Sequence, residues 1–157
     1  MEFDPKHIQI LRQGPKAWNA WRARDNSVVP NLVGIFLRLG ELQLAPINGG
    51  PINLANARLR GACFRYASLS QANLEAADLS EADFSYARLN HANLAYANLG
   101  NAVFLHADLA GANLLKANLC GADFGKARNL TQRQLFGTFG NSLTILPAEI
   151  LAPESWA

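Results

Sequence analysis

Clustered carboxylates, histidines and cysteines are the side chains of this 157-residue chain that could carry out chemistry. Glu75, Asp78, Glu81 and Asp83 cluster in sequence and would suit a catalytic acid and base if the fold brought two of them to one cleft. The other candidates are His7, His91, His106, Cys63 and Cys120. The histidines and cysteines lack the paired spacing of a zinc site, and two distant cysteines define no disulfide framework. What these groups can do depends on the elements that position them.

A five-residue repeat positions most of these groups. From Leu54 to Phe124 every fifth residue is Leu or Phe, and from Ala57 to Ala122 an Ala stands two residues before each. Residues two apart in extended backbone share a face, so the Ala and the Leu or Phe point inward together. A turn must then occur within every five residues. The repeat predicts a chain that coils around an apolar axis.

The phenylalanines indicate how many sides a coil has. Phe64, Phe84, Phe104 and Phe124 occupy the core position of every fourth pentapeptide. If four pentapeptides make one coil, these rings lie on one side and stack along the core. A coil of three or five sides would scatter them. We therefore predict a four-sided solenoid with a phenylalanine stack as its structural core.

The repeat unit, as in Ala72-Asn73-Leu74 and Ala107-Asp108-Leu109, resembles the pentapeptide-repeat family, which is widespread in bacteria and numerous in cyanobacteria. The resemblance implies an all-β solenoid, a right-handed quadrilateral β-helix, with short helical caps at both ends. It divides the chain into a helical cap (1–29), degenerate repeats or an irregular first coil (30–52), the regular array (53–128) and a C-terminal helix and tail (129–157).

The two ends of the array are expected to be covered. Short helices broken at Gly14-Pro15 precede it, and Trp18 and Trp21 share a helix face that would pack on the first coil. Upstream of the array, apolar residues also recur at every fifth position. They form either an extra coil or a loop that imitates the pattern. These residues are Leu32, Leu37, Leu42, Ile47 and Ile52.

A capping box beginning at Thr131 predicts a helix after the array. It would run from Gln132 to about Phe139 and stop at Gly140. The apolar residues expected to cover the last coil are Leu135, Phe136 and Phe139.

The residues before each core Leu or Phe point outward and form columns. The predicted hydrogen-bonded amide ladder is Asn53, Asn73, Asn93 and Asn113. The columns of alternating charge are Arg88, Asp108, Arg128 and Arg58, Asp78, which we expect to pair between coils. The clustered carboxylates would lie on different sides of a convex surface. We therefore predict no catalytic, metal or cofactor site.

One outer feature is apolar. The candidate protein-contact strip on the phenylalanine side, called the contact strip below, consists of Tyr66, Tyr86, Val103, Leu105 and His106. An exposed apolar strip often marks an interaction site. The alternative is a ladder of stacked rings that only stiffens the turn.

Charge and composition limit the classes of partner and the cell compartments that we expect for the chain. The chain carries 14 basic and 12 acidic residues, a net charge of +2, which gives no reason to expect a nucleic-acid partner. With neither a signal peptide nor a membrane span in evidence, we expect a cytoplasmic protein without membrane insertion. The prediction is a non-enzymatic, rigid scaffold for a protein partner or for self-association. The alternative, a DNA-mimicking topoisomerase-binding protein, is disfavoured by the near-neutral array.

Overall fold

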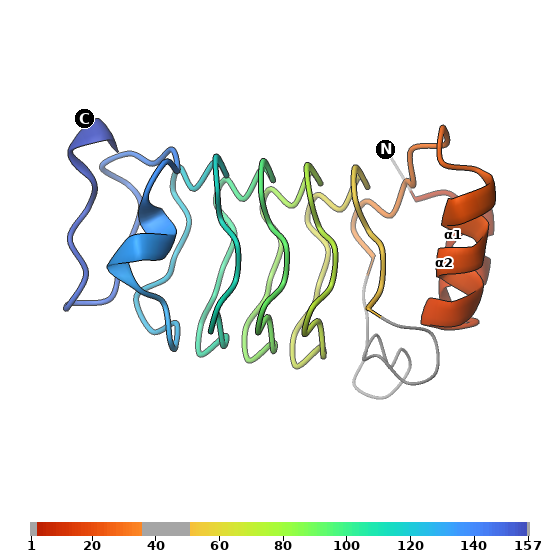
Figure 1. Cartoon of the computed structure of the whole chain (residues 1–157), viewed down its shortest axis with the longest axis horizontal. Coiled ribbons are helices and arrows are strands. Elements are labelled where there is room, and N and C mark those ends of the chain that lie inside the picture. The colour runs from red at the N-terminus through yellow and green to blue at the C-terminus, as the bar shows by residue number, and fades with distance from the viewer. Residues whose placement is uncertain (1–2, 36–50, 157) are drawn as a thin grey trace.

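The computed structural model describes residues 3–35 and 51–156, which form an elongated stack of coils with two helices at the N-terminal end (Figure 1). The C-terminus lies at the other end of the stack. The predicted core positions Leu37, Leu42 and Ile47 lie outside the described residues. None of the described helices is long and apolar enough to cross a bilayer.

Parallel β-bridges hold the stack together, each joining residues that stand four pentapeptides apart in the array. Asn53 pairs with Asn73, Asn73 with Asn93, and Asn93 with Asn113, and the other columns of the array repeat this register. Each bridge is isolated because a turn follows within two residues, which leaves no room for a longer strand. The register confirms four pentapeptides per coil.

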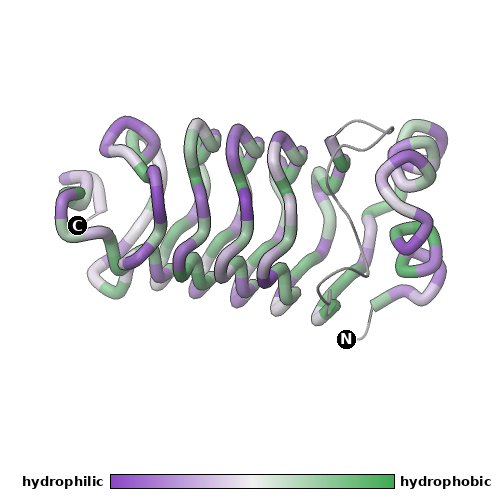
Figure 2. Tube along the Cα trace, turned by 90° about the horizontal axis from the view of Figure 1, so that it is seen from below, coloured by the Kyte–Doolittle hydropathy of each residue, from purple (hydrophilic) through white to green (hydrophobic). Residues whose placement is uncertain are grey.

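The core is the line of Leu and Phe residues along the axis. All of them from Leu54 to Phe124 are buried, and they alternate with polar residues along each coil (Figure 2). The rings of Phe64, Phe84, Phe104 and Phe124 form the predicted stack, with centroids 5.0, 5.1 and 4.3 Å apart and planes within 10° of parallel. A side-chain period of five therefore produces a continuous apolar column.

Helices α1 (Pro5–Leu11) and α2 (Pro15–Arg24) close the N-terminal end. Each begins with a proline, whose missing N–H costs nothing in the first turn. Trp18 and Trp21 are buried, as predicted from their shared face. Trp18 Nε1 donates to Asn53 O at 2.6 Å, and the Asn19 amide bonds both Asn53 N and Pro51 O. Side chains of α2 thus take the place of a neighbouring strand at the edge of the first coil.

A partial coil lies beside the first regular one. Asn31 forms a parallel bridge with Arg58, and Leu32 is fully buried at the level of Leu59. This bridge encloses a longer stretch of sequence than the bridges within the array do. Ile52 is also buried, but it occupies the alanine position of its pentapeptide, as shown by the bond from Asn73 N to Ile52 O.

The helix predicted from Gln132 to Phe139 is wrong in length. Only a 3₁₀-helix, η1 (Gln132–Leu135), forms, although the Gln134 side chain does accept the Thr131 N–H. Phe136 is extended and Gly137 turns the chain with φ at 75°. Phe139 then joins the ladder through a bridge to Asn118, so backbone pairing with the last coil replaces further helix.

The predicted cover of the last coil is also only partly correct. Leu135 is buried, but Phe136 is 84% exposed and Phe139 is 59% exposed. Trp156, in the second 3₁₀-helix η2 (Glu154–Trp156), covers this end instead. Its ring occupies the space that a side chain at Gly140 would need, and its Nε1 donates to Thr138 O at 3.1 Å. Glycine at position 140 therefore admits the tryptophan to the core.

Candidate interaction surface

The contact strip is built on corners of the coil. Tyr66, Tyr86 and His106 each stand two residues after a core Phe, with φ of 61°, 61° and 56°. This left-handed conformation costs residues other than glycine about 1–2 kcal/mol each. Their amides donate to the next coil, to Ser85 O, Leu105 O and Lys126 O respectively. The ladder therefore holds three rings in one column.

Ring contacts run along this column. The Tyr66 and Tyr86 rings stack with centroids 4.8 Å apart and an angle of 12°, and Tyr86 meets His106 at 5.1 Å with a tilt of 38°. Tyr66 is 52% exposed, Tyr86 is 37% exposed, and His106 is half-buried. The rings thus support one another and still present a face to solvent.

Val103 and Leu105 flank the column beside His106. Both lie next to the core residue Phe104 in sequence, and both are 36% exposed. Val103 forms bridges with Asp83 and Asp123, which places it in the middle of its own column. The structure therefore brings the five predicted residues together on one side of the coil.

The sequence analysis missed one neighbour of the strip. Ile145 pairs with Asp123 and is exposed, and its side chain reaches the level of Gly125. It therefore extends the apolar surface toward the C-terminal end. The available signal was the triplet Thr144-Ile145-Leu146, which imitates the repeat unit slightly out of its register.

Arg65 borders the strip on its polar side. Its guanidinium lies 5.8 Å from the Tyr66 ring and 6.0 Å from the Tyr86 ring, and its NH1 pairs with Asp83 at 3.0 Å. The hydrogen bond with Asp83 raises the pKa of Arg65. Burial alone would raise the pKa of Asp83, but hydrogen bonds from Ser85 and the pairing with Arg65 outweigh it, so this pKa lies below its ordinary 3.8.

The lowered pKa of Asp83 predicts acid sensitivity. A carboxylate whose pKa is lower in the folded state stabilises the fold above its unfolded pKa and loses that contribution as pH falls through the folded value. We expect the free energy of unfolding to fall as pH drops below about 4. The measurement is urea unfolding as a function of pH.

An Asp83→Asn variant serves as the comparison for this prediction. Asn already occupies equivalent positions of other repeats, where the Asn73 and Asn93 side chains accept the same local amide bond. The variant should remain folded and show a shallower decline in acid. Parallel curves for the two proteins would show that Asp83 does not contribute to acid sensitivity.

The asparagine column forms the predicted ladder. Each Nδ2 donates to the Oδ1 of the preceding coil, at 3.3 Å for Asn73 to Asn53, 3.4 Å for Asn93 to Asn73 and 3.1 Å for Asn113 to Asn93. A second column does the same, from Asn118 through Asn98 to Asp78. These oxygens also accept backbone N–H groups two residues ahead. Both columns therefore serve the structure.

The predicted charge columns are confirmed in their alignment, but no close ion pair forms within a column of the described array. A hydrogen bond from Asn129 is the main cause that lowers the pKa of Asp108, and the charge of Arg128 lowers it further. Arg88 NH2 donates to Ser68 Oγ and Arg128 Nε donates to His106 O. Within the described part of the array, the ion pairs are Arg60–Glu81 at 2.7 Å and Arg65–Asp83 at 3.0 Å. Neither pair joins residues of one column, so these long side chains reach diagonally to the next coil.

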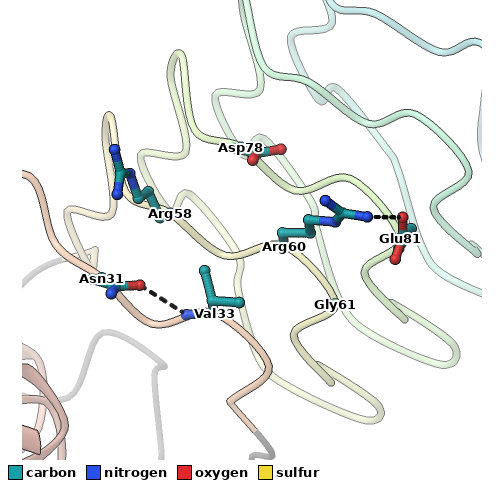
Figure 3. Close-up of a pocket in the computed structure, with 7 residues that line it drawn as sticks. All are labelled: Asn31, Val33, Arg58, Arg60, Gly61, Asp78 and Glu81. Carbon is teal, nitrogen blue, oxygen red and sulfur yellow. Dashed lines mark hydrogen bonds and ion pairs between the residues drawn. The ribbon is translucent and has the colours of Figure 1, made fainter. Parts of the chain in front are cut away.

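The clustered carboxylates occupy separate outer positions, as predicted. Asp78 accepts from Ser80 and Asn98, Glu75 accepts from Asn93, and Glu81 pairs with Arg60. A hollow of about 480 Å³ near the first coil is lined in part by Arg58, Arg60, Asp78 and Glu81 (Figure 3). The two arginines point in different directions and Arg60 is already paired with Glu81, so the hollow does not direct its two cations at a common point.

The histidines and cysteines also lie apart. The His91 ring lies over Gly111, His106 belongs to the aromatic column, and buried His7 accepts the Asn31 N–H through Nδ1 at 3.0 Å. Cys63 and Cys120 are free thiols. Among residues 3–35 and 51–156, no three His, Cys, Asp or Glu side chains are placed to hold a metal ion.

These repeats and bridges define a solenoid of five-residue units, and comparisons with known proteins place it. The family model for pentapeptide repeats matches residues 52–90 and 87–125, in eight copies. The chain is 32% identical to the pentapeptide-repeat protein Rfr23 of the cyanobacterium Cyanothece 51142, over 73% of this chain and 86% of that one, with a TM-score of 0.63. The chain belongs to the pentapeptide-repeat family.

Two further solved structures are similar. A pentapeptide-repeat protein of the Arabidopsis thaliana thylakoid lumen is 30% identical over 66% of this chain and 70% of that one, with a TM-score of 0.48. HetL of Nostoc sp. strain PCC 7120, a protein involved in heterocyst differentiation regulation, is 30% identical over 77% of this chain and 55% of that one, with a TM-score of 0.34. No curated protein matches the chain.

Proposed function

We propose that this protein is a rigid, non-enzymatic scaffold that binds a protein partner through the contact strip. The observation that carries the proposal is the stacked, partly exposed aromatic column with exposed Val103 and Leu105 beside it. An exposed apolar strip with polar tips is typical of interaction surfaces, in which aromatic residues often dominate the binding energy.

The way the strip is held supports this role. Its rings are stacked, and its backbone is bonded to the coils on either side. A partner would therefore meet a preorganised surface and lose little conformational entropy on binding. We propose the right-handed, four-sided β-helix of the family as the frame, since equivalent corners of successive coils would lie above one another and hold such a column in line.

A Leu105→Glu substitution tests the proposal. It places a charge within the strip, beside His106, at a side chain that is partly exposed in the folded protein. We expect at least about tenfold weaker binding of the partner, because an interface charge would be desolvated without a counterpart. The measurement is affinity purification with the tagged protein from its host, followed by titration of the purified partner.

Leu115→Glu is the matched control. Leu115 is 45% exposed but flanks the asparagine ladder on another side of the coil. A partner retained by the wild type and Leu115→Glu but lost with Leu105→Glu supports the strip. Partners that bind all three proteins equally would remove the strip from the proposal.

The DNA-mimic alternative gains no support from the surface. Residues 53–128 hold seven basic and six acidic side chains, so the array is not a polyanion. Two of the acidic residues, Glu81 and Asp83, are also neutralised by arginines. A mimic of duplex DNA needs dense, unpaired negative charge.

A further inference from the structure

Charge is distributed unevenly along the axis of the molecule. Residues 1–29, the N-terminal cap, hold five basic and three acidic side chains, a net charge of +2. Residues 129–156 hold one basic and two acidic side chains, a net charge of −1. These segments lie at opposite ends of the stack (Figure 1). The two ends of one molecule are therefore electrostatically complementary to each other.

The N-terminal end has a hollow with an apolar floor and a cationic rim. Its volume is about 360 Å³ and its lining is Phe3, Pro5, Lys6, Ile8, Gln9 and Arg12. Phe3 is exposed, as are Lys6 and Arg12 beside it. Among the described residues that line it, Lys6 and Arg12 are cations and none is a carboxylate. Such a hollow fits an apolar side chain flanked by acidic residues.

The C-terminal end presents a segment of this kind, called the acidic tail below (Glu149 to Glu154). Leu151 is 75% exposed, and Glu149 and Glu154 are exposed on either side of it in sequence. The Gln132 amide holds the segment in place, donating to Leu151 O at 2.9 Å and accepting from Leu151 N at 3.0 Å. The tail is thus preorganised for contact.

We propose that the acidic tail of one copy binds the N-terminal hollow of the next, so that copies associate head to tail. Leu151 would enter the apolar floor, and Glu149 and Glu154 would face Lys6 and Arg12. Because the two surfaces lie at opposite ends of an elongated stack, a head-to-tail contact between them extends into a row of copies and does not close into a small ring. This head-to-tail contact shares no residue with the contact strip, so a test of one surface does not decide the other.

Sedimentation velocity of the purified full chain tests this association. We expect species larger than the monomer to grow with protein concentration at low ionic strength. They should diminish as salt is raised from about 0.01 M to about 1 M, because the screening length falls from roughly 30 Å to roughly 3 Å. A wild-type chain that stays monomeric up to about 1 mM at low salt would overturn the proposal.

Two charge-reversed chains identify the surfaces. The head variant carries Lys6→Glu and Arg12→Glu, and the tail variant carries Glu149→Lys and Glu154→Lys. Each alone should associate at least about tenfold more weakly than the wild type. Mixed together they should associate again, because the unaltered tail of the head variant fits the unaltered head of the tail variant, and the two reversed surfaces are complementary as well. An unfolded variant could not give this rescue.

A control separates the hollow from total charge. Lys16→Glu with Arg24→Glu changes the net charge as much as the head variant does, at exposed residues of α2 outside the hollow. It should weaken association by less than about threefold. Association that survives in both the head and the tail variant, or a mixture that stays monomeric, would overturn head-to-tail contact.

Discussion

Replacing Phe104 with Ala is expected to lower the free energy of unfolding by about 3–5 kcal/mol. The Phe104 side chain is fully buried and stacks on Phe84 and Phe124 at 5.1 and 4.3 Å. The coils cannot close around the hole, because Val103 is bridged to the coils on both sides of it. Urea unfolding followed by circular dichroism measures the loss.

Two further substitutions allow the loss of stability in Phe104→Ala to be compared with smaller changes. Phe104→Leu introduces the residue that fills most other core positions, and we expect a loss of about 1–2 kcal/mol. Tyr86→Ala removes a ring of the outer column, which is partly solvated, and should cost about 0.5–1.5 kcal/mol. A Phe104→Ala loss no greater than that of Tyr86→Ala would mean that the inner stack does not dominate the stability.

Trp18→Ala should have a comparable effect at the end of the molecule. The side chain is fully buried between α2 and the first coil, and its indole N–H satisfies Asn53 O. Removing it opens a cavity and leaves the edge of the first coil without one of its partners. We expect the free energy of unfolding to fall by about 3–5 kcal/mol. Each coil of a stacked array is stabilised by its neighbours, so loss of the cap should make the first coil unfold before the others.

Trp18→Phe separates the two contributions. It keeps most of the apolar volume but removes the donor to Asn53 O, so we expect a loss of about 1–3 kcal/mol. Hydrogen exchange should show faster exchange at Asn53, whose amide is bonded to Asn19 of the same helix as Trp18. Unchanged exchange in the first coil of Trp18→Ala would show that the cap does not protect this edge.

The repeat made the array predictable. Its period of five is a local property, and the recurrence of Phe64, Phe84, Phe104 and Phe124 at every fourth unit allowed one register. Bridges at that interval and stacked rings in the core follow directly. The outer columns follow as well, because a residue two places after each core position must lie at a corner. The aromatic column of the contact strip is therefore predictable from the sequence.

Side chains that leave their own column were not predictable. Arg60 pairs with Glu81 and Arg65 with Asp83, and in each pair the partner lies outside the column of the arginine. A long guanidinium side chain can reach several neighbours at similar cost, and local hydrogen bonds decide among them. Asp83, for example, also accepts the Ser85 N–H. The sequence pattern specifies the register of the backbone, but it does not specify which partner each arginine side chain selects.

The two ends of the solenoid show which features the sequence determines and which depend on the tertiary structure. By itself the sequence determined the coil, its four-unit period, its core and its two proline-initiated N-terminal helices, because each rests on a local pattern of residue types. The tertiary structure decided that Asn19 completes a strand edge, that η1 stops at Leu135 and that Trp156 fills the space over Gly140. Those outcomes depend on the unpaired backbone groups and the uncovered apolar core at the end coils. Such groups and such a core exist only once the coils have stacked.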